Sequence, residues 1–202
     1  MARHIAIVGN GSFARSDASA IDRCDLVIRF NDCRSVGEGG SRTDVVAVCN
    51  TGRPASAMIR QSAWREKAPI GLATGIWCVR DGEKFAELKP RLAAHYPDLD
   101  DFCDDYTSEF TQFATESAKT LTVIPRRYHD QIDEELQALL ISNYVVPSSG
   151  LIAISYVLGE VADDDDTVLL AGFNHEGWSG HPFAAERDLV EGYIVKGQLR
   201  RL

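Results

Sequence analysis

The chain begins with a short apolar run that leads directly into a glycine-rich loop. Residues 4–8 read HIAIV, and Gly9, Asn10, Gly11 and Ser12 follow them without a gap. A β-branched run of this length is typical of a buried strand, and glycine after it allows a tight turn, because glycine adopts backbone angles that other residues avoid. The N-terminal segment therefore predicts a buried strand that enters a loop.

Further apolar runs alternate with amphipathic segments along the chain. Strands are expected at residues 25–30, 43–49, 70–79, 121–124 and 167–173, and helices at 16–21, 54–67, 83–95, 98–116, 126–140, 149–161 and 182–202. Alternating strands and helices predict an α/β fold with a mainly parallel sheet and helices on both faces. With 202 residues, 45% of them hydrophobic, we expect one domain over residues 1–202.

The charge and cysteine content exclude several classes of protein. The net charge is −9, and non-specific nucleic-acid binding requires clustered cations, so we expect no nucleic-acid partner. No apolar run approaches the roughly 20 residues that span a bilayer, and no signal-peptide pattern is present, which predicts a cytoplasmic protein without a membrane span. The five cysteines form no Cys-x-x-Cys pair, which indicates structural thiols rather than a metal or redox site.

The loop after the first strand has more than one interpretation. Its backbone N–H groups lie where an anion could approach, since Gly9 and Gly11 lack the Cβ that would block it. Gly9-x-Gly11-x-x-Ala14 also fits the dinucleotide fingerprint, with Asp32 near the place of the ribose-binding acid, which would indicate an NAD-dependent oxidoreductase. A third interpretation is that the glycines serve only the turn.

Two details argue against the dinucleotide interpretation. Residues 15–22 are short and polar, whereas a longer amphipathic helix normally packs behind the glycines. The second strand ends in Arg29, Phe30 and Asn31, which offer a cation and an amide rather than a lone carboxylate. An amide can donate to a phosphate oxygen and also accept from a hydroxyl, so Asn10 and Asn31 are candidates for binding a nucleotide.

A second polar cluster begins an apolar helix. Pro147-Ser148-Ser149-Gly150 reads as a rigid turn that presents hydroxyls and backbone amides at a helix N-terminus. Such a terminus binds anions, because its amides point outward and the helix dipole favours negative charge. The alternative is an ordinary N-cap made by Ser148 or Ser149.

A third cluster contains two histidines and a glutamate. His181 begins the last predicted helix, and Glu186 follows a little over one turn later, so that it would orient His181 or brace the loop. A histidine titrates near neutrality and can act as a general base. His175 is a second candidate. His175 and His181, with Glu176 and Glu186 near by, would suggest metal ligation, but no third ligand has a convincing spacing, and we expect no metal.

These clusters resemble the motifs of the sialyltransferases, glycosyltransferase family 29. IAIVGNGS (5–12), DLVIRFN (25–31) and GSRT (40–43) resemble the family's large donor-binding motif, residues 147–173 its small motif, and HPFAAE (181–186) its very small motif. The resemblance implies a sialyltransferase-type fold, GT-A-like and Rossmann-related. It also implies transfer of sialic acid or a related acidic sugar from a cytidine monophosphate (CMP)-activated donor to a glycan hydroxyl.

The resemblance also implies roles for single residues. Asn10 and Asn31 would contact the CMP part of the donor, and Ser148, Ser149 and Gly150 would face its carboxylate and phosphate. His181 would be the general base of an inverting, metal-independent reaction. Such a reaction requires preorganised donors that stabilise the departing phosphate, and Arg29, Arg15 or His175 are the candidates for that role. The partners would be a CMP-sugar donor, which is a substrate rather than a cofactor, and a glycan acceptor.

The resemblance is incomplete, and this supports a second hypothesis. The family's cysteine pair is absent, the aromatic third motif is replaced by NHEGW at residues 174–178, and the chain is short for the family's catalytic domain. The alternative is a noncatalytic nucleotide-binding accessory protein. Short proteins of this kind resemble ones that are linked to urease gene clusters.

Overall fold

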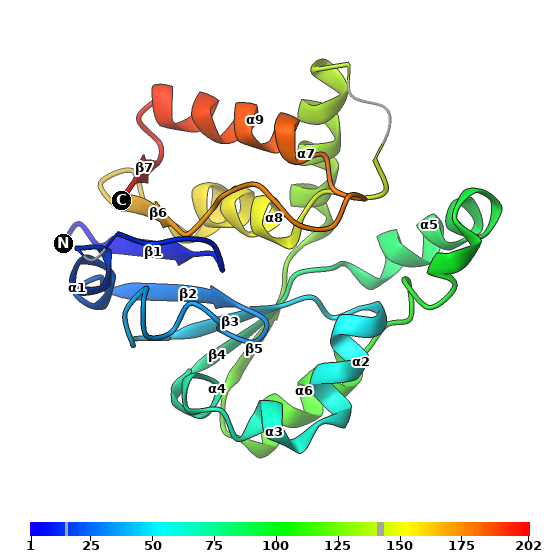
Figure 1. The fold of residues 1–202 in the computed structure, drawn as a ribbon, viewed down its shortest axis with the longest axis horizontal. Helices are drawn as coiled ribbons and strands as arrows, with labels where there is room; N and C mark the ends of the chain where they lie inside the picture. Colours follow the sequence, from blue (N-terminus) through cyan, green and yellow to red (C-terminus); the bar gives the residue numbers. More distant parts are fainter. Residues whose placement is uncertain (15, 141–143) are drawn as a thin grey trace.

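Seven parallel strands form one sheet in the order β5-β4-β3-β2-β1-β6-β7 (Figure 1). The computed structural model describes residues 1–14, 16–140 and 144–202. The strands are β1 His4–Val8, β2 Leu26–Phe30, β3 Val45–Val48, β4 Gly75–Cys78, β5 Thr120–Val123, β6 Thr167–Ala171 and β7 Arg200–Arg201.

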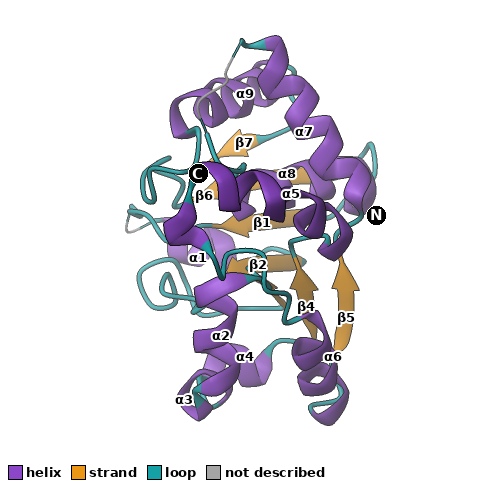
Figure 2. Cartoon of the chain, turned by 90° about the vertical axis from the view of Figure 1, so that its right-hand side faces the viewer, coloured by secondary structure: helices purple, strands orange, loops and turns teal. Residues whose placement is uncertain are grey.

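Helices connect the strands and cover both faces of the sheet. They are α1 Asp17–Asp22, α2 Gly52–Arg60, α3 Ser62–Arg65, α4 Ala68–Leu72, α5 Gly82–His95, α6 Thr107–Glu116, α7 Arg126–Ala138, α8 Ser149–Tyr156 and α9 Phe183–Val195. A 3₁₀ turn, Pro97–Leu99, follows α5, and a π-helical segment, Val157–Val161, continues α8. In Figures 1 and 2, α7, α8 and α9 lie on one face, and α2, α3, α4 and α6 lie on the other.

The strands are buried on both sides because their side chains alternate between two apolar layers. In β1, Ile5 and Ile7 pack with α7, α8 and α9, whereas Ala6 and Val8 pack against the side that carries α1. In β3, Val46 and Val48 likewise belong to the layer built by α2, α3, α4 and α6. Successive residues of a strand point to opposite faces, so a near-continuous apolar run is what a doubly covered parallel sheet requires. The predicted fold class is therefore confirmed.

The strand order places a topological switch between β1 and β6. From β1 the chain adds β2, β3, β4 and β5 on one side, and it then returns to add β6 on the other side. Loops at the carboxyl ends of β1 and β6 thus leave in opposite directions and open a crevice between them. The polar residues singled out in the sequence follow these strand ends.

Two predicted elements in the first half are shorter than expected. The helix expected at residues 54–67 is divided, because Gln61 is extended and separates α2 from α3. The strand expected at residues 70–79 includes only β4, and its first part belongs to α4, which has Pro69 in its first turn. Proline at the start of a helix is favourable, since its missing N–H would have no helical partner there.

The acidic segment and the C-terminus also differ from the prediction. Only residues 107–116 of the helix expected at 98–116 are α-helical, and residues 100–106 form turns and loop. The closing helix expected at 182–202 ends at Val195 and is followed by β7. A two-residue edge strand carries no periodicity, so pairing with β6 alone defines it.

Among the residues that the structure describes, none of the helices is both long enough and apolar enough to cross a membrane. All five cysteine thiols are free and buried.

Candidate functional site

A cavity of about 730 Å³ opens at the carboxyl edge of the sheet, beside the switch between β1 and β6. Its walls come from the loops after β1, β2, β3, β4 and β6 and from the start of α8. Of the residues singled out in the sequence, it is lined by Gly9, Asn10, Gly11, Asn31, Ser148, Ser149, Gly150, His175, His181 and Glu186. The fold therefore brings together three clusters that are far apart in the chain.

The glycines of the first loop allow the loops after β1 and β6 to approach each other closely. Gly9 N donates to the Ala171 carbonyl and Gly11 N to the Gly172 carbonyl, both at 2.8 Å. A Cβ on Gly9 would lie 2.3 Å from the Gly172 carbonyl oxygen, and one on Gly11 would lie 2.7 Å from the same atom. These two amides are thus already bonded, and the absence of a Cβ allows the loop after β6 to approach. The structural interpretation of the glycines accounts for both positions.

Replacing Gly9 by alanine is expected to lower the free energy of unfolding by about 2 kcal/mol, because the loops after β1 and β6 must separate to admit the methyl group. Urea denaturation measures this change. Gly192→Ala is the matched control, since this helical glycine has no atom within 4 Å of an added Cβ and gains helix propensity. Equal stability of wild type and Gly9→Ala would contradict the close approach.

Asn31 offers the cavity an amide group from a constrained backbone. Its φ of +51° lies in the left-handed region, which asparagine tolerates better than most residues. Its side-chain Oδ1 accepts from Cys49 N at 2.8 Å, and its carbonyl accepts from Trp64 Nε1 at 3.1 Å. Within the described part of the chain, Nδ2 of Asn31 and the side chain of Asn10 have no hydrogen-bond partner. Both amides are therefore available to a ligand.

Glu186 braces the turn that begins α8. Its two carboxylate oxygens accept from Ser148 N and Ser148 Oγ, both at 2.6 Å, while Ser148 Oγ accepts from Leu151 N at 3.2 Å. Ser148 is thus the N-cap, as one of the sequence alternatives held. Glu186 is 2% exposed, and burial raises the pKa of its carboxyl group. Its partner is this turn rather than His181.

The ring of His181 is fixed by one hydrogen bond and two aromatic neighbours. Nδ1 lies 2.9 Å from the Val146 carbonyl, and the rings of Trp178 and Phe183 meet the imidazole edge to face. A carbonyl only accepts, so Nδ1 carries the proton and Nε2 is left as an acceptor. Burial, opposed by the Val146 carbonyl, lowers the pKa of His181, which keeps the ring neutral near pH 7. His181 thus suits accepting a hydrogen bond from a ligand hydroxyl.

His175 occupies a different part of the cavity wall. It has a φ of +52°, and its Nε2 lies 3.3 Å from a guanidinium nitrogen of Arg201 in β7. Burial, followed by the positive charges of Arg201 and Arg187, lowers the pKa of His175. Its neutral ring pairs with a cation and lines the cavity near the end of β6.

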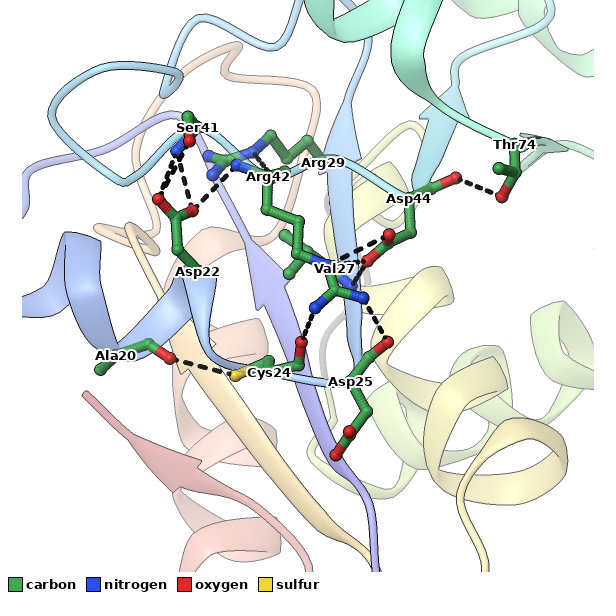
Figure 3. A network of polar contacts seen from close by, with 10 residues as sticks. All are labelled: Ala20, Asp22, Cys24, Asp25, Val27, Arg29, Ser41, Arg42, Asp44 and Thr74. Atoms are coloured by element: carbon green, nitrogen blue, oxygen red, sulfur yellow. Dashed lines mark hydrogen bonds and ion pairs between the residues drawn. The ribbon is translucent and has the colours of Figure 1, made fainter.

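Three candidates from the sequence are not part of the cavity wall, and a fourth lies outside the described residues. Arg29 is 0% exposed and is absent from the cavity wall: its guanidinium donates to the Arg42 carbonyl, Ser35 Oγ and the Gly39 carbonyl, at 2.9, 2.9 and 2.7 Å. Figure 3 shows it beside the segment from Ser41 to Asp44. Ser12 is not part of the wall, although its backbone N donates to Asn174 Oδ1, which belongs to a wall residue. Asp32 pairs with Lys67 at 3.1 Å and is also outside the wall. Arg15 lies outside the described residues.

Three arginines that the sequence analysis passed over also line the cavity: Arg34, Arg53 and Arg80. Arg53 is neutralised by Asp101 at 2.9 Å. Phe102 and Trp178 form an aromatic wall, with ring centroids 5.4 Å apart. Its position in the sequence could have indicated Arg80, because it directly follows the strand predicted at residues 70–79, and residues after the carboxyl ends of parallel strands meet at one edge. Over residues 1–14, 16–140 and 144–202, no group of three or more His, Cys, Asp or Glu side chains is placed to hold a metal ion.

The fold and the cavity define an α/β protein with a Rossmann-like parallel sheet and a small-molecule pocket at its switch point. The chain is 51% identical over 200 residues to the urease operon 23 kDa accessory protein of Rhizobium meliloti (strain 1021), a match that covers 99% of this chain and 93% of the relative. It belongs to the family of that accessory protein. A scan against protein-family models finds no match.

Solved structures of similar fold are sialyltransferases of low sequence identity. A mammalian sialyltransferase in complex with Gal-beta-1-3GalNAc-ortho-nitrophenol has a TM-score of 0.59 and 17% identity, and the match covers 100% of this chain and 69% of the other. The sialyltransferase CstII from Campylobacter jejuni, in complex with cytidine-5'-monophosphate, has a TM-score of 0.54 and 11% identity, covering 99% and 79%. At such identities the likeness concerns the fold.

The assignment to the sialyltransferases is therefore wrong, because the near full-length relative is a urease operon accessory protein. The descriptions of the chain as a glycosyltransferase, and as a sialyltransferase that uses CMP-sialic acid, are wrong for the same reason. In this chain the motifs that suggested them follow strand ends and a helix start, and they lie around one cavity. The CMP-sugar donor and the glycan acceptor were implied by the sialyltransferase resemblance alone, and they are withdrawn with it. The relationship favours the alternative of an accessory protein linked to a urease cluster.

Proposed function

We propose that this protein is a noncatalytic accessory protein of a urease system, and that it binds a small nucleotide in the cavity beside β1 and β6. The accessory role is supported by the 51% identical relative from a urease operon. The binding role is carried by one observation: a cavity of about 730 Å³ at the switch point of a parallel sheet. This volume is within the range of about 300–1,000 Å³ typical of small-molecule sites.

The groups around the cavity suit a ligand with hydroxyl and phosphate groups. Asn10 and Asn31 present amides, and His181 presents an acceptor nitrogen. The backbone amides of Ser149 and Gly150, the first two residues of α8, have no hydrogen-bond partner among the described residues. Amides can donate to phosphate oxygens, and helix N-termini favour anions, so a nucleoside monophosphate is the simplest ligand of this class.

Asn31→Asp is expected to weaken binding of cytidine monophosphate at least about tenfold, because it replaces the Nδ2 donor by an anionic oxygen. The change keeps the shape of the side chain and the oxygen that accepts from Cys49 N. Calorimetric titration with cytidine monophosphate, adenosine monophosphate and NAD measures the effect.

Asp32→Asn is the matched control, because Asp32 is adjacent, pairs with Lys67 and does not line the cavity. We expect it to bind as the wild type does. Binding that survives Asn31→Asp unchanged would place the ligand elsewhere, and failure of all three ligands to bind would reject the nucleotide.

The accessory role has a separate test in cells. In Rhizobium meliloti without the gene for the 23 kDa relative, expression of this chain is expected to restore urease activity in lysates, whereas Asn31→Asp is expected to restore less at equal protein level. If loss of the relative leaves urease activity unchanged, the accessory role is rejected.

A further inference from the structure

Arg80 is a buried arginine in the cavity wall with a rigid setting. It follows β4 by two residues and is 6% exposed. Its backbone N donates to Asn50 Oδ1 at 2.7 Å, and Asn50 Nδ2 donates back to its carbonyl at 2.9 Å. Because Asn50 is itself 0% exposed, these two bonds fix the point at which the side chain leaves the backbone.

The guanidinium group is held by one hydrogen bond and two aromatic rings. Nη1 donates to Thr51 Oγ1 at 2.5 Å. The Cζ atom lies 4.8 Å from the ring centre of Phe85 and 4.5 Å from that of Phe102. Stacking on aromatic faces orients a planar guanidinium without neutralising it. Trp178 packs on Phe102 and continues this wall toward His181.

The charge of Arg80 has no carboxylate partner. Among the described residues, no Asp or Glu oxygen lies within 4.0 Å of its guanidinium, whereas Arg53, which lines the same cavity, is paired with Asp101. Nε and Nη2 donate to no group in the described chain. Among the described residues, the buried side-chain N and O atoms that lack a partner are Thr43 Oγ1 and Ser155 Oγ, so Nε and Nη2 of Arg80 are not fully buried. Both donors therefore open toward solvent-filled space.

The position of Arg80 fits one end of a nucleotide. The sheet order places β4 two strands from β2, which separates Arg80 and Asn31 by about 10 Å at the usual strand spacing. Helix α8 contacts β3, the strand between them, and its first two residues, Ser149 and Gly150, line the same cavity as Asn31 and Arg80. A nucleoside held by Asn31 would extend its phosphate toward Arg80.

We propose that Arg80 binds the phosphate group of the ligand, with the α8 amides as supporting donors. The proposal rests on the proposed nucleotide-binding function and names the residue that selects a charged ligand over an uncharged one. An isolated buried cation is costly for the folded protein, and a bound dianion supplies the charge that the chain itself lacks. The planar guanidinium matches two phosphate oxygens at once through its unused Nε and Nη2.

Arg80 and Ser149 also border a smaller cavity of about 300 Å³ behind this wall, which contains Lys84, Arg91 and Arg126. Arg80 is thus part of the wall of both cavities. A phosphate ion bound in the larger cavity must exclude the phosphate group of a nucleotide, whereas one bound in the smaller cavity need not. Competition between inorganic phosphate and a nucleotide therefore shows which cavity holds the phosphate ion.

The test is calorimetric titration of wild type and variants with cytidine monophosphate, cytidine and inorganic phosphate. Wild type is expected to bind the monophosphate between about 10-fold and 150-fold more tightly than cytidine. Arg80→Gln is expected to lose this preference while its affinity for cytidine is unchanged. Arg80→Lys keeps the charge without the planar fork and is expected to retain part of the preference. Inorganic phosphate is expected to compete with the monophosphate in wild type.

Arg65→Gln is the matched control, because Arg65 also lies over an aromatic ring, that of Phe113, but is remote from the cavity wall. It is expected to keep the full preference. A folded Arg80→Gln, judged by its melting temperature, that still prefers the monophosphate would overturn the proposal, as would phosphate binding that does not compete.

Failure of the two proposals can be told apart. If wild type binds neither cytidine nor its monophosphate, the nucleotide function fails, and the phosphate titration alone decides on Arg80: binding lost in Arg80→Gln supports the anion site, and binding retained overturns it.

Discussion

Replacing Arg29 by methionine is expected to lower the free energy of unfolding by about 4 kcal/mol, the largest effect that we predict for a single substitution. Arg29 is fully buried in β2, and its guanidinium donates to the Arg42 carbonyl, Ser35 Oγ and the Gly39 carbonyl. Each bond from a charged donor contributes about 1.5–3 kcal/mol, and relief of the buried charge offsets part of that sum.

Urea denaturation of Arg29→Met measures the loss, which should also lower the melting temperature by about 10 °C in a chain of this size. Arg23→Met is the control, since Arg23 is exposed and close by in the sequence. The loop from residue 31 to residue 43 should become more sensitive to proteolysis in Arg29→Met alone. A variant within about 1 kcal/mol of wild type would show that the loop holds its shape without this arginine.

Replacing Glu186 by alanine is expected to cost about 3 kcal/mol of stability, because Ser148 N and Ser148 Oγ both lose their acceptor and a cavity replaces the buried carboxylate. The turn at the start of α8 should loosen, which also weakens binding of cytidine monophosphate. Glu186→Gln keeps the volume and one acceptor oxygen, so it is expected to lose about half as much. Equal stability of Glu186→Ala and wild type in urea would refute the bracing role.

The same residue predicts a pH dependence. Burial raises the pKa of Glu186 in the folded protein above its ordinary value of 4.5, so the folded state holds this proton more tightly than the unfolded chain. The stability that the residue contributes is therefore complete below pH 4.5 and declines as the pH rises through the raised pKa. The difference in free energy of unfolding between wild type and Glu186→Gln should shrink over this interval. A difference that grows with pH would mean that the ionised form is the stabilised one.

Much of the candidate site follows from local sequence. Gly9, Asn10, Asn31 and the turn at Ser148 each come directly after an apolar run or directly before one, and parallel strands carry such residues to one edge. The sequence did not show which polar groups bond to other parts of the protein and which are available to a ligand. Arg29 was expected to bind a phosphate, but its guanidinium donates to the loop that contains Gly39. Arg80 was not among the expected site residues, and it lies in the cavity wall.

The function was the part most open to error from motifs alone. In this chain a glycine loop, strand-end asparagines and a serine-glycine helix start surround one cavity. The sialyltransferases share the fold at identities of only 11–17%. The 51% identity over nearly the whole chain is the stronger evidence of relationship. It favours the accessory hypothesis, which the missing third motif and short chain had already suggested.

The sequence by itself determined the layered α/β architecture, because a parallel strand that is buried on both faces requires a continuous apolar run, and short segments such as IAIV at residues 5–8 are such runs. Only the tertiary structure decided the break at Gln61, the edge strand β7, the pairing of Glu186 with Ser148 and the place of Arg80 in the cavity wall. These features depend on contacts between residues far apart in the chain, and no local periodicity encodes which buried charge finds a partner and which is left for a ligand.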